Sequence, residues 1–144
     1  MTTVQMEFKL KLHSTTPSKA HNTDAGFDLY ASENIVIPAR NGAKVQTGVA
    51  VDIVPGYVGL LFSRSGMGIK GVRLSNCVGV IDSGYQGDIT VLIHNDTDMP
   101  YYINIRDKIA QLVLVPIPRV ELKFVEDFSV DTARGEKGFG STGQ

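Results

Sequence analysis

Apolar and polar side chains alternate with a period of two along most of this chain, and that pattern constrains the fold more than any other feature. Phe8, Leu10 and Leu12 alternate with two lysines. Similar runs, rich in β-branched residues, cover 35–37, 45–53, 57–62, 89–94, 109–117 and 120–125. A period of two suits a strand, whereas a helix needs a period near 3.6. Only 65–71 could form a short helical turn, so we predict an all-β sandwich or barrel.

Composition narrows the classes of partner. The 144 residues carry 14 basic and 15 acidic side chains, for a net charge of -1. This balance argues against a nucleic-acid binder or a membrane-surface protein that works by bulk positive charge. The longest apolar runs, such as 112–115, are too short to span a bilayer. The single cysteine, Cys77, cannot form an internal disulfide, and we expect it to be a small core residue. We expect a cytoplasmic protein, or a nuclear or host-cytoplasmic one if its source is eukaryotic or viral.

The chain divides into one domain and a tail. Residues 1–127 show no linker, repeat or low-complexity tract, and we assign them to a single β-barrel domain. Residues 128–144 are mostly polar and rich in glycine, and from 129 onwards Phe139 is their only aromatic residue. We expect this segment to be a flexible C-terminal arm.

Two glycine-rich motifs and the three histidines lack the sequence context that their usual functions require. Residues 66–71 and 138–143 both fit the pattern G-x-G-x-x-G. A dinucleotide site also needs a helix after the glycines, and neither segment is followed by a helical pattern. The three histidines, His13, His21 and His94, stand alone and lack the spacing of metal ligands.

Five polar islands interrupt the apolar strands. In chain order they lie around Asp28, at Arg64-Ser65-Gly66, between Asn76 and Thr90, around Gln111, and from Arg134 to Gly143. An arginine beside a serine and a flexible glycine suits a phosphate group. Asp82 follows an apolar strand and precedes a turn, which would bring a carboxylate to the lip of a pocket. Taken singly, each island has an ordinary structural interpretation, such as a turn, a hairpin end or a satisfied core amide.

Taken together and in this order, the five islands resemble the motifs of the trimeric all-β dUTPases (deoxyuridine 5′-triphosphate nucleotidohydrolases). The resemblance implies a jelly-roll-like β-barrel that forms a homotrimer with shared active sites, in which the C-terminal arm is exchanged over the neighbouring subunit. It implies hydrolysis of dUTP to dUMP and pyrophosphate with Mg²⁺, through attack of water on the α-phosphorus. This reaction keeps uracil out of DNA and supplies dUMP for thymidylate synthesis. No nucleic-acid or membrane partner is implied.

The resemblance also assigns roles on the nucleoside side of the site. Asp82 stands where the family keeps its general base, and Tyr85 stands where a ring packs under the deoxyribose. Uracil would be read by the hairpin between Asn76 and Thr90, largely through backbone groups. Its matched positions are Asn76, Gly79, Val80, Ile81 and Thr90.

The remaining roles concern the phosphates, the metal and the arm. Arg64, Ser65, Gly66 and Gln111 match phosphate-binding positions, and Asp28 matches an aspartate that orients water around Mg²⁺. The metal itself would be carried mainly by the triphosphate. In the arm, Arg134 would reach the γ-phosphate and Phe139 would stack on uracil. Gly140, Ser141 and Thr142 would donate hydrogen bonds to the substrate.

Two alternatives stay open. A dCTP deaminase-like enzyme would share the fold but needs a glutamate base near the third island, where residues 80–89 offer only Asp82 and Asp88. A non-catalytic nucleotide-binding or signalling β-trimer would be expected to lose Asp82, Tyr85 or the arm, all of which are present.

Overall fold

The structure is a computed structural model of the chain, and it describes residues 1–140 and 143. Ten strands and one short helix make up its regular elements within these residues. Every strand pair is antiparallel. The helix, α1 (Ser65–Gly68), has only four residues. None of the described residues belongs to a helix that is long and apolar enough to cross a membrane.

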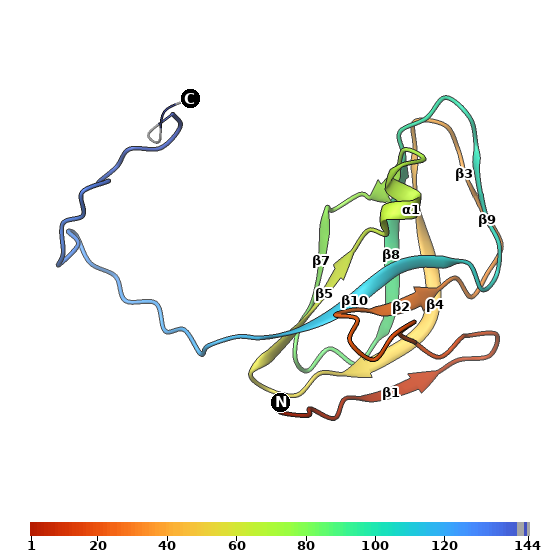
Figure 1. Ribbon diagram of the computed structural model, residues 1–144, viewed down its shortest axis with the longest axis horizontal. Helices are drawn as coiled ribbons and strands as arrows, with labels where there is room; N and C mark the ends of the chain where they lie inside the picture. The colour runs from red at the N-terminus through yellow and green to blue at the C-terminus, as the bar shows by residue number, and fades with distance from the viewer. Residues whose placement is uncertain (141–142, 144) are drawn as a thin grey trace.

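Two four-stranded sheets form the body of the molecule (Figure 1). The first sheet has the order β1 (Glu7–Leu10), β4 (Gly42–Asp52), β8 (Asp88–Asn95) and β6 (Val72–Leu74). The second has the order β2 (Phe27–Tyr30), β10 (Lys108–Pro116), β5 (Tyr57–Phe62) and β7 (Val78–Ile81). A separate pair joins β3 (Ile35–Ile37) to β9 (Tyr101–Ile103). Strands distant in sequence are neighbours throughout, and the all-β, jelly-roll-like fold is confirmed.

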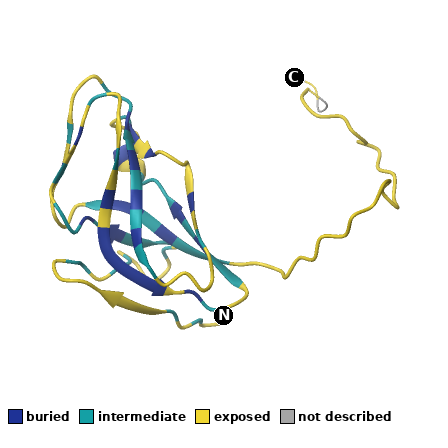
Figure 2. Ribbon diagram, turned by 180° about the vertical axis from the view of Figure 1, so that it is seen from behind, coloured by how far each residue is buried: buried dark blue, intermediate teal, exposed yellow. Residues whose placement is uncertain are grey.

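The core lies between the two large sheets. Fully buried side chains come from both of them, including Val45 and Ile93 of the first sheet and Leu29, Leu61 and Leu112 of the second. Strand β8 shows the alternation directly, because its buried residues occupy every second position (Figure 2). The period of two in the sequence therefore reflects one face of each sheet packed inward and the other exposed.

A bulge bends β4 where it leaves β8. Gln46 pairs with Thr90, but Ala50 pairs with Asp88, so the intervening residues of β4 have no regular partners in β8. The buried Thr47 side chain compensates, because its Oγ1 donates to the carbonyl oxygen of Ile89 at 2.6 Å. Gly48 adopts a φ of 63°, and a Cβ there would collide with the Ser14 hydroxyl. Glycine at this position lets the segment after β1 pack against the bulge.

The prediction of a strand at 120–125 is wrong. Strand β10 ends at Pro116, and residues 117–140 are exposed and contain no strand. Leu122 is 97% exposed and Phe124 is 88% exposed. Figure 1 shows this segment leaving the body of the molecule. Alternation alone does not make a strand, because an extended segment also needs an edge to pair with.

The short helical turn expected near 65–71 is confirmed, as α1. No helix follows residues 66–71, because β6 begins at Val72. The expectation for Cys77 is wrong. Cys77 is exposed and has a φ of 62°, which places it in the tight turn between β6 and β7 rather than in the core.

Candidate functional site

The second sheet aligns three of the sequence-predicted islands across its strands. Gln111 of β10 pairs with Asp28 of β2 on one side and with Phe62 of β5 on the other. Ser63 and Arg64 follow Phe62 directly. Because paired residues of neighbouring strands lie about 5 Å apart, this register brings the first, second and fourth islands to one end of the sheet.

Asp28 is the centre of an ionic cluster at this end. Its carboxylate is only 18% exposed and lies 3.4 Å from Nε of Arg64 and 3.0 Å from Nζ of Lys108. A carboxylate with this little exposure requires charged partners, and here it has two. The sequence identified Asp28 and Arg64 but missed Lys108, because its contact with Asp28 depends on the pairing of β10 with β2.

Gln111 is fixed by its neighbours. Its Nε2 donates to the carbonyl oxygen of Ser63 at 3.2 Å. Gly26 approaches it closely, because a Cβ at Gly26 would stand 2.9 Å from Oε1 of Gln111. The amide is therefore held between the end of β5 and the segment before β2.

The Arg64–Gly66 loop opens toward solvent. Arg64 has extended backbone angles and precedes α1, while Ser65 and Gly66 begin the helix and are exposed. A Cβ at Gly66 would meet no atom within 4 Å. The first N–H groups of a helix have no acceptor within it, so backbone donors here can bind an anion together with the arginine.

A hollow of about 400 Å³ lies between β7 and β8, at the third island. Five of the residues assigned to uracil line it: Asn76, Gly79, Val80, Ile81 and Thr90. Gly79 allows β7 to lie close to β5, because a Cβ there would stand 3.0 Å from the Cβ of Leu61. Lys44 also lines this hollow, and no feature of the sequence had pointed to it.

Asp82 and Tyr85 share the turn that follows β7. The N–H of Tyr85 donates to the carbonyl oxygen of Asp82 at 3.2 Å, and Gly84 supplies the left-handed φ of 90° that the turn needs. The Tyr85 hydroxyl donates to the carbonyl oxygen of Asp88 at 3.0 Å. The Asp88 carboxylate is itself ion-paired with Lys11, a contact that the sequence did not reveal.

Asp82 and Arg64 lie at opposite ends of β5. Asp82 follows Ile81, which pairs with Gly59, whereas Arg64 follows the far end of the same strand. Because the pairing is antiparallel, Asp82 lies opposite residue 58, and at 3.3 Å per residue the six positions from 58 to 64 separate the two backbones by roughly 20 Å. The described part of the chain therefore does not bring Asp82 and Arg64 together within one subunit.

Within the described residues, the hydrogen bonds of the arm are internal to it. Arg134 donates from Nε to the carbonyl oxygen of Lys137 within the arm itself, and Phe139 is fully exposed. Figure 1 shows that the chain after β10 extends away from the sheets. Ser141 and Thr142 lie outside the described residues.

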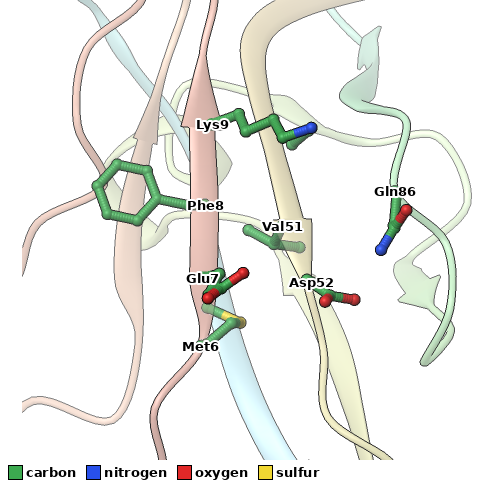
Figure 3. A pocket seen from close by; sticks show the side chains of 8 residues that line it. Met6, Glu7, Phe8, Lys9, Val51, Asp52 and Gln86 are labelled. Atoms are coloured by element: carbon green, nitrogen blue, oxygen red, sulfur yellow. The ribbon is translucent and has the colours of Figure 1, made fainter.

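Another hollow, of about 530 Å³, lies between β1 and β4 and contains none of the sequence-predicted residues (Figure 3). Phe8 and Lys9 point to opposite sides of β1 there, as alternation requires. Among the described residues, no three His, Cys, Asp or Glu side chains cluster closely enough to hold a metal ion.

Comparison with known proteins decides the family. Residues 13–143 match the family model of dUTPase. The chain belongs to the dUTPase family. The match covers every strand after β1 and most of the arm, and the family predicted from the five motifs is confirmed.

Curated dUTPases are similar over nearly the whole chain. A deoxyuridine 5′-triphosphate nucleotidohydrolase of Mycobacterium marinum is 44% identical over 88% of this chain and 86% of its own length. One of Tropheryma whipplei is 41% identical over 99% of this chain and 96% of its own length. The family is thus one of enzymes, the dUTP diphosphatases.

Solved dUTPases of staphylococcal phages share the fold. A mutant of the Staphylococcus bacteriophage 80alpha dUTPase with dUpNHpp is 37% identical and superimposes with a TM-score of 0.92, covering 99% of this chain and all of that one. A mutant dUTPase of phage phi11 of S. aureus, which coordinates a structural Mg(II) ion, is 34% identical with a TM-score of 0.82, over 88% of this chain and all of that one.

Proposed function

We propose that this protein hydrolyses dUTP to dUMP and pyrophosphate at sites shared between subunits of a homotrimer. Its membership of the dUTPase family supports the reaction, and the phage relative with dUpNHpp supports a dUTP-like ligand. The observation that supports a shared site is the separation of roughly 20 Å along β5 between the backbones of Asp82 and Arg64. One nucleotide can contact both groups only if a second subunit supplies one of them.

Asp82 is the proposed general base. The carboxylate would take a proton from water as its oxygen bonds to the α-phosphorus, while the bond to the α,β-bridging oxygen breaks and pyrophosphate leaves. A base must lie within hydrogen-bond reach of the attacking water. Asp82 is exposed beside the hollow assigned to uracil, and no ion pair within the described residues engages it.

Selectivity for deoxyuridine follows from the hairpin. We place uracil in the hollow lined by Asn76, Gly79 and Thr90, and the deoxyribose against the Tyr85 ring. A ribose 2′-OH has no room against that ring, and the fixed backbone donors and acceptors mismatch cytosine. The phosphates would then lie against Arg64, Ser65, Gly66 and Gln111 of a neighbouring subunit.

The residues present fit a hydrated Mg²⁺ that the substrate carries. The Asp28 carboxylate stands at the phosphate end, and Arg64 and Lys108 already occupy it. It is therefore suited to hold a metal-bound water rather than the ion. Mg²⁺ keeps several waters and binds through substrate phosphates, where it would neutralise their developing charge.

We assign the exposed arm a role in closing the site. Arg134 would bind the γ-phosphate, Phe139 would stack on uracil, and Gly140, Ser141 and Thr142 would donate hydrogen bonds. An exposed aromatic ring in a glycine-rich arm is costly in water and becomes favourable once it covers a base. Closure of this kind also excludes water from the reacting groups.

The biological role proposed for the reaction is to keep uracil out of DNA and to supply dUMP for thymidylate synthesis. We place the protein in the cytoplasm, a reducing compartment that suits the exposed thiol of Cys77. The dCTP deaminase alternative loses support because Asp88, the other acid of the hairpin, is held by Lys11.

Product chromatography tests the proposal. The protein is incubated with Mg²⁺ and dUTP, dCTP, dTTP or UTP in separate reactions. Conversion of dUTP alone, to dUMP and pyrophosphate, is the expected result. Deoxyuridine nucleotides formed from dCTP would favour the deaminase, and a folded trimer that converts none of the four would favour a binding module.

A further inference from the structure

A hollow of about 710 Å³ lies between α1 and the loop that leads into β10, and four of its eleven lining residues are basic. Arg64, Lys70, Arg106 and Lys108 line it, with Asp107 as the only acid among the lining residues. This cationic hollow touches the phosphate loop through Arg64. Neither Lys70 nor Arg106 belongs to the positions that the family motifs assign to substrate.

The charges of the cationic hollow do not cancel. Arg64 and Lys108 share the carboxylate of Asp28, and the Asp107 carboxylate accepts a hydrogen bond from the N–H of Asn104 at 2.8 Å. Counting four cations against Asp28 and Asp107 leaves 4 − 2 = 2 positive charges. Within the described residues, Lys70 and Arg106 form no ion pair. Uncompensated cations that line one hollow attract an anion.

Arg106 holds this position against its backbone preference. Its φ is 72°, in the left-handed region that glycine occupies at little cost and other residues occupy rarely. Its N–H donates to the carbonyl oxygen of Ala31 at 2.8 Å, which fixes the loop in this conformation. Glycine would adopt this backbone conformation at less cost. The presence of arginine therefore indicates that its guanidinium group has a role of its own.

We propose that the cationic hollow binds a diphosphate group, through Lys70 and Arg106 together with Arg64 and Lys108. The diphosphate is either free pyrophosphate or the terminal phosphates of a nucleotide. Guanidinium and ammonium donors around an open hollow match its several charged oxygens. Its link to turnover, as a site that receives the leaving pyrophosphate, rests on the proposed function, whereas binding of the anion does not.

Calorimetric titration of the protein with inorganic pyrophosphate, without nucleotide, tests the site. Arg106→Gly and Lys70→Gln should each weaken the affinity by about tenfold, the usual loss of one charge-assisted contact. Arg40→Gly is the matched control, because Arg40 also has a left-handed φ, of 58°, but does not line the hollow. The control removes the same charge and should leave the affinity within about twofold of the parent, since Arg40 does not line the hollow and its exposed guanidinium is already paired with Asp98.

Misfolding cannot imitate the expected result. Glycine relieves the left-handed backbone, so thermal melting should show Arg106→Gly to be folded and at least as stable as the parent protein. If Arg106→Gly binds pyrophosphate as the Arg40→Gly control does, the site is refuted. Binding lost equally in all three variants would indicate non-specific charge and would also refute it.

Two further measurements complete the test. One identifies the source of the diphosphate, and the other distinguishes failure of the diphosphate site from failure of the proposed function. Competition between pyrophosphate and dUpNHpp would identify the ligand as the nucleotide's terminal phosphates, and simultaneous binding would identify free pyrophosphate. Hydrolysis of dUTP is measured separately on the same samples. Hydrolysis without Arg106-dependent binding overturns only the diphosphate site, whereas Arg106-dependent binding without hydrolysis overturns only the proposed function.

Discussion

The ring of Tyr85 lies directly against Gly87. A Cβ at Gly87 would stand 2.6 Å from the tyrosine hydroxyl and 2.7 Å from Cζ, closer than side chains tolerate. The same hydroxyl donates a hydrogen bond to the carbonyl oxygen of Asp88. The ring also occupies the space that a side chain at position 87 would need. The position of the ring therefore depends on glycine at position 87.

Gly87→Ala should displace the Tyr85 ring while leaving the fold intact. We expect kcat/KM for dUTP to fall by about a hundredfold, since a displacement of about 1 Å near the reacting groups has effects of that size. Discrimination against UTP should weaken as well. Gln86→Ala, which changes the exposed neighbour, is the control. Unchanged kinetics in Gly87→Ala would mean that the ring does not contact the sugar.

Asp82→Asn should remove the general base while conserving shape. We expect kcat to fall by roughly 10²–10⁴-fold, the range of a positioned base, with little change in the affinity for dUpNHpp. Steady-state kinetics and calorimetry measure the two effects. Asp52→Asn changes an exposed carboxylate outside the hairpin and should behave as the parent. Near-normal turnover by Asp82→Asn would rule out the assignment.

Deletion of residues 134–144 should abolish most turnover without changing the assembly. The described residues of the deleted segment, 134–140 and 143, are exposed and contribute nothing to the buried core, so the core does not depend on them. Light scattering should give three times the chain mass for both the full and the shortened protein. A shortened protein as active as the parent would show that the arm does not take part in closure.

Asp28→Asn should destabilise the phosphate end of the second sheet. It leaves Arg64 and Lys108 without their shared carboxylate, and because all three are partly exposed we expect a loss of about 1–2 kcal/mol. Urea unfolding at fixed protein concentration measures it. Asp98→Asn breaks the exposed pair with Arg40 and should have a smaller effect. Equal effects in the two variants would mean that the cluster has no special strength.

The sequence predicted the strands best where alternation coincided with a partner. The runs at 57–62 and 89–94 became β5 and β8, whose inward residues fill the core. The short strands β6 and β9 escaped notice, whereas the equally short β3, whose three residues are all β-branched, was predicted. Residues 120–125 alternate equally well, yet no edge of the same chain pairs with them.

The candidate site was also predictable only in part from the sequence. The motifs located Asp28, Arg64 and Gln111, and strand register then placed them side by side. Their partners were invisible in the sequence, because Lys108 and Lys11 bind carboxylates through contacts that depend on pairing across strands. The exposure of Cys77 was missed for a related reason, since the turn that exposes it depends on its left-handed φ.

The length of β5 has a genetic consequence. If each site takes Asp82 from one subunit and Arg64 from another, a subunit with Asp82→Asn and a subunit with Arg64→Ala are defective in different halves of the site. A trimer that contains both kinds of subunit would have one site at which the wild-type Asp82 and the wild-type Arg64 meet. Two inactive alleles expressed in one cell would then complement each other, whereas two alleles that damage the same end of β5 would not.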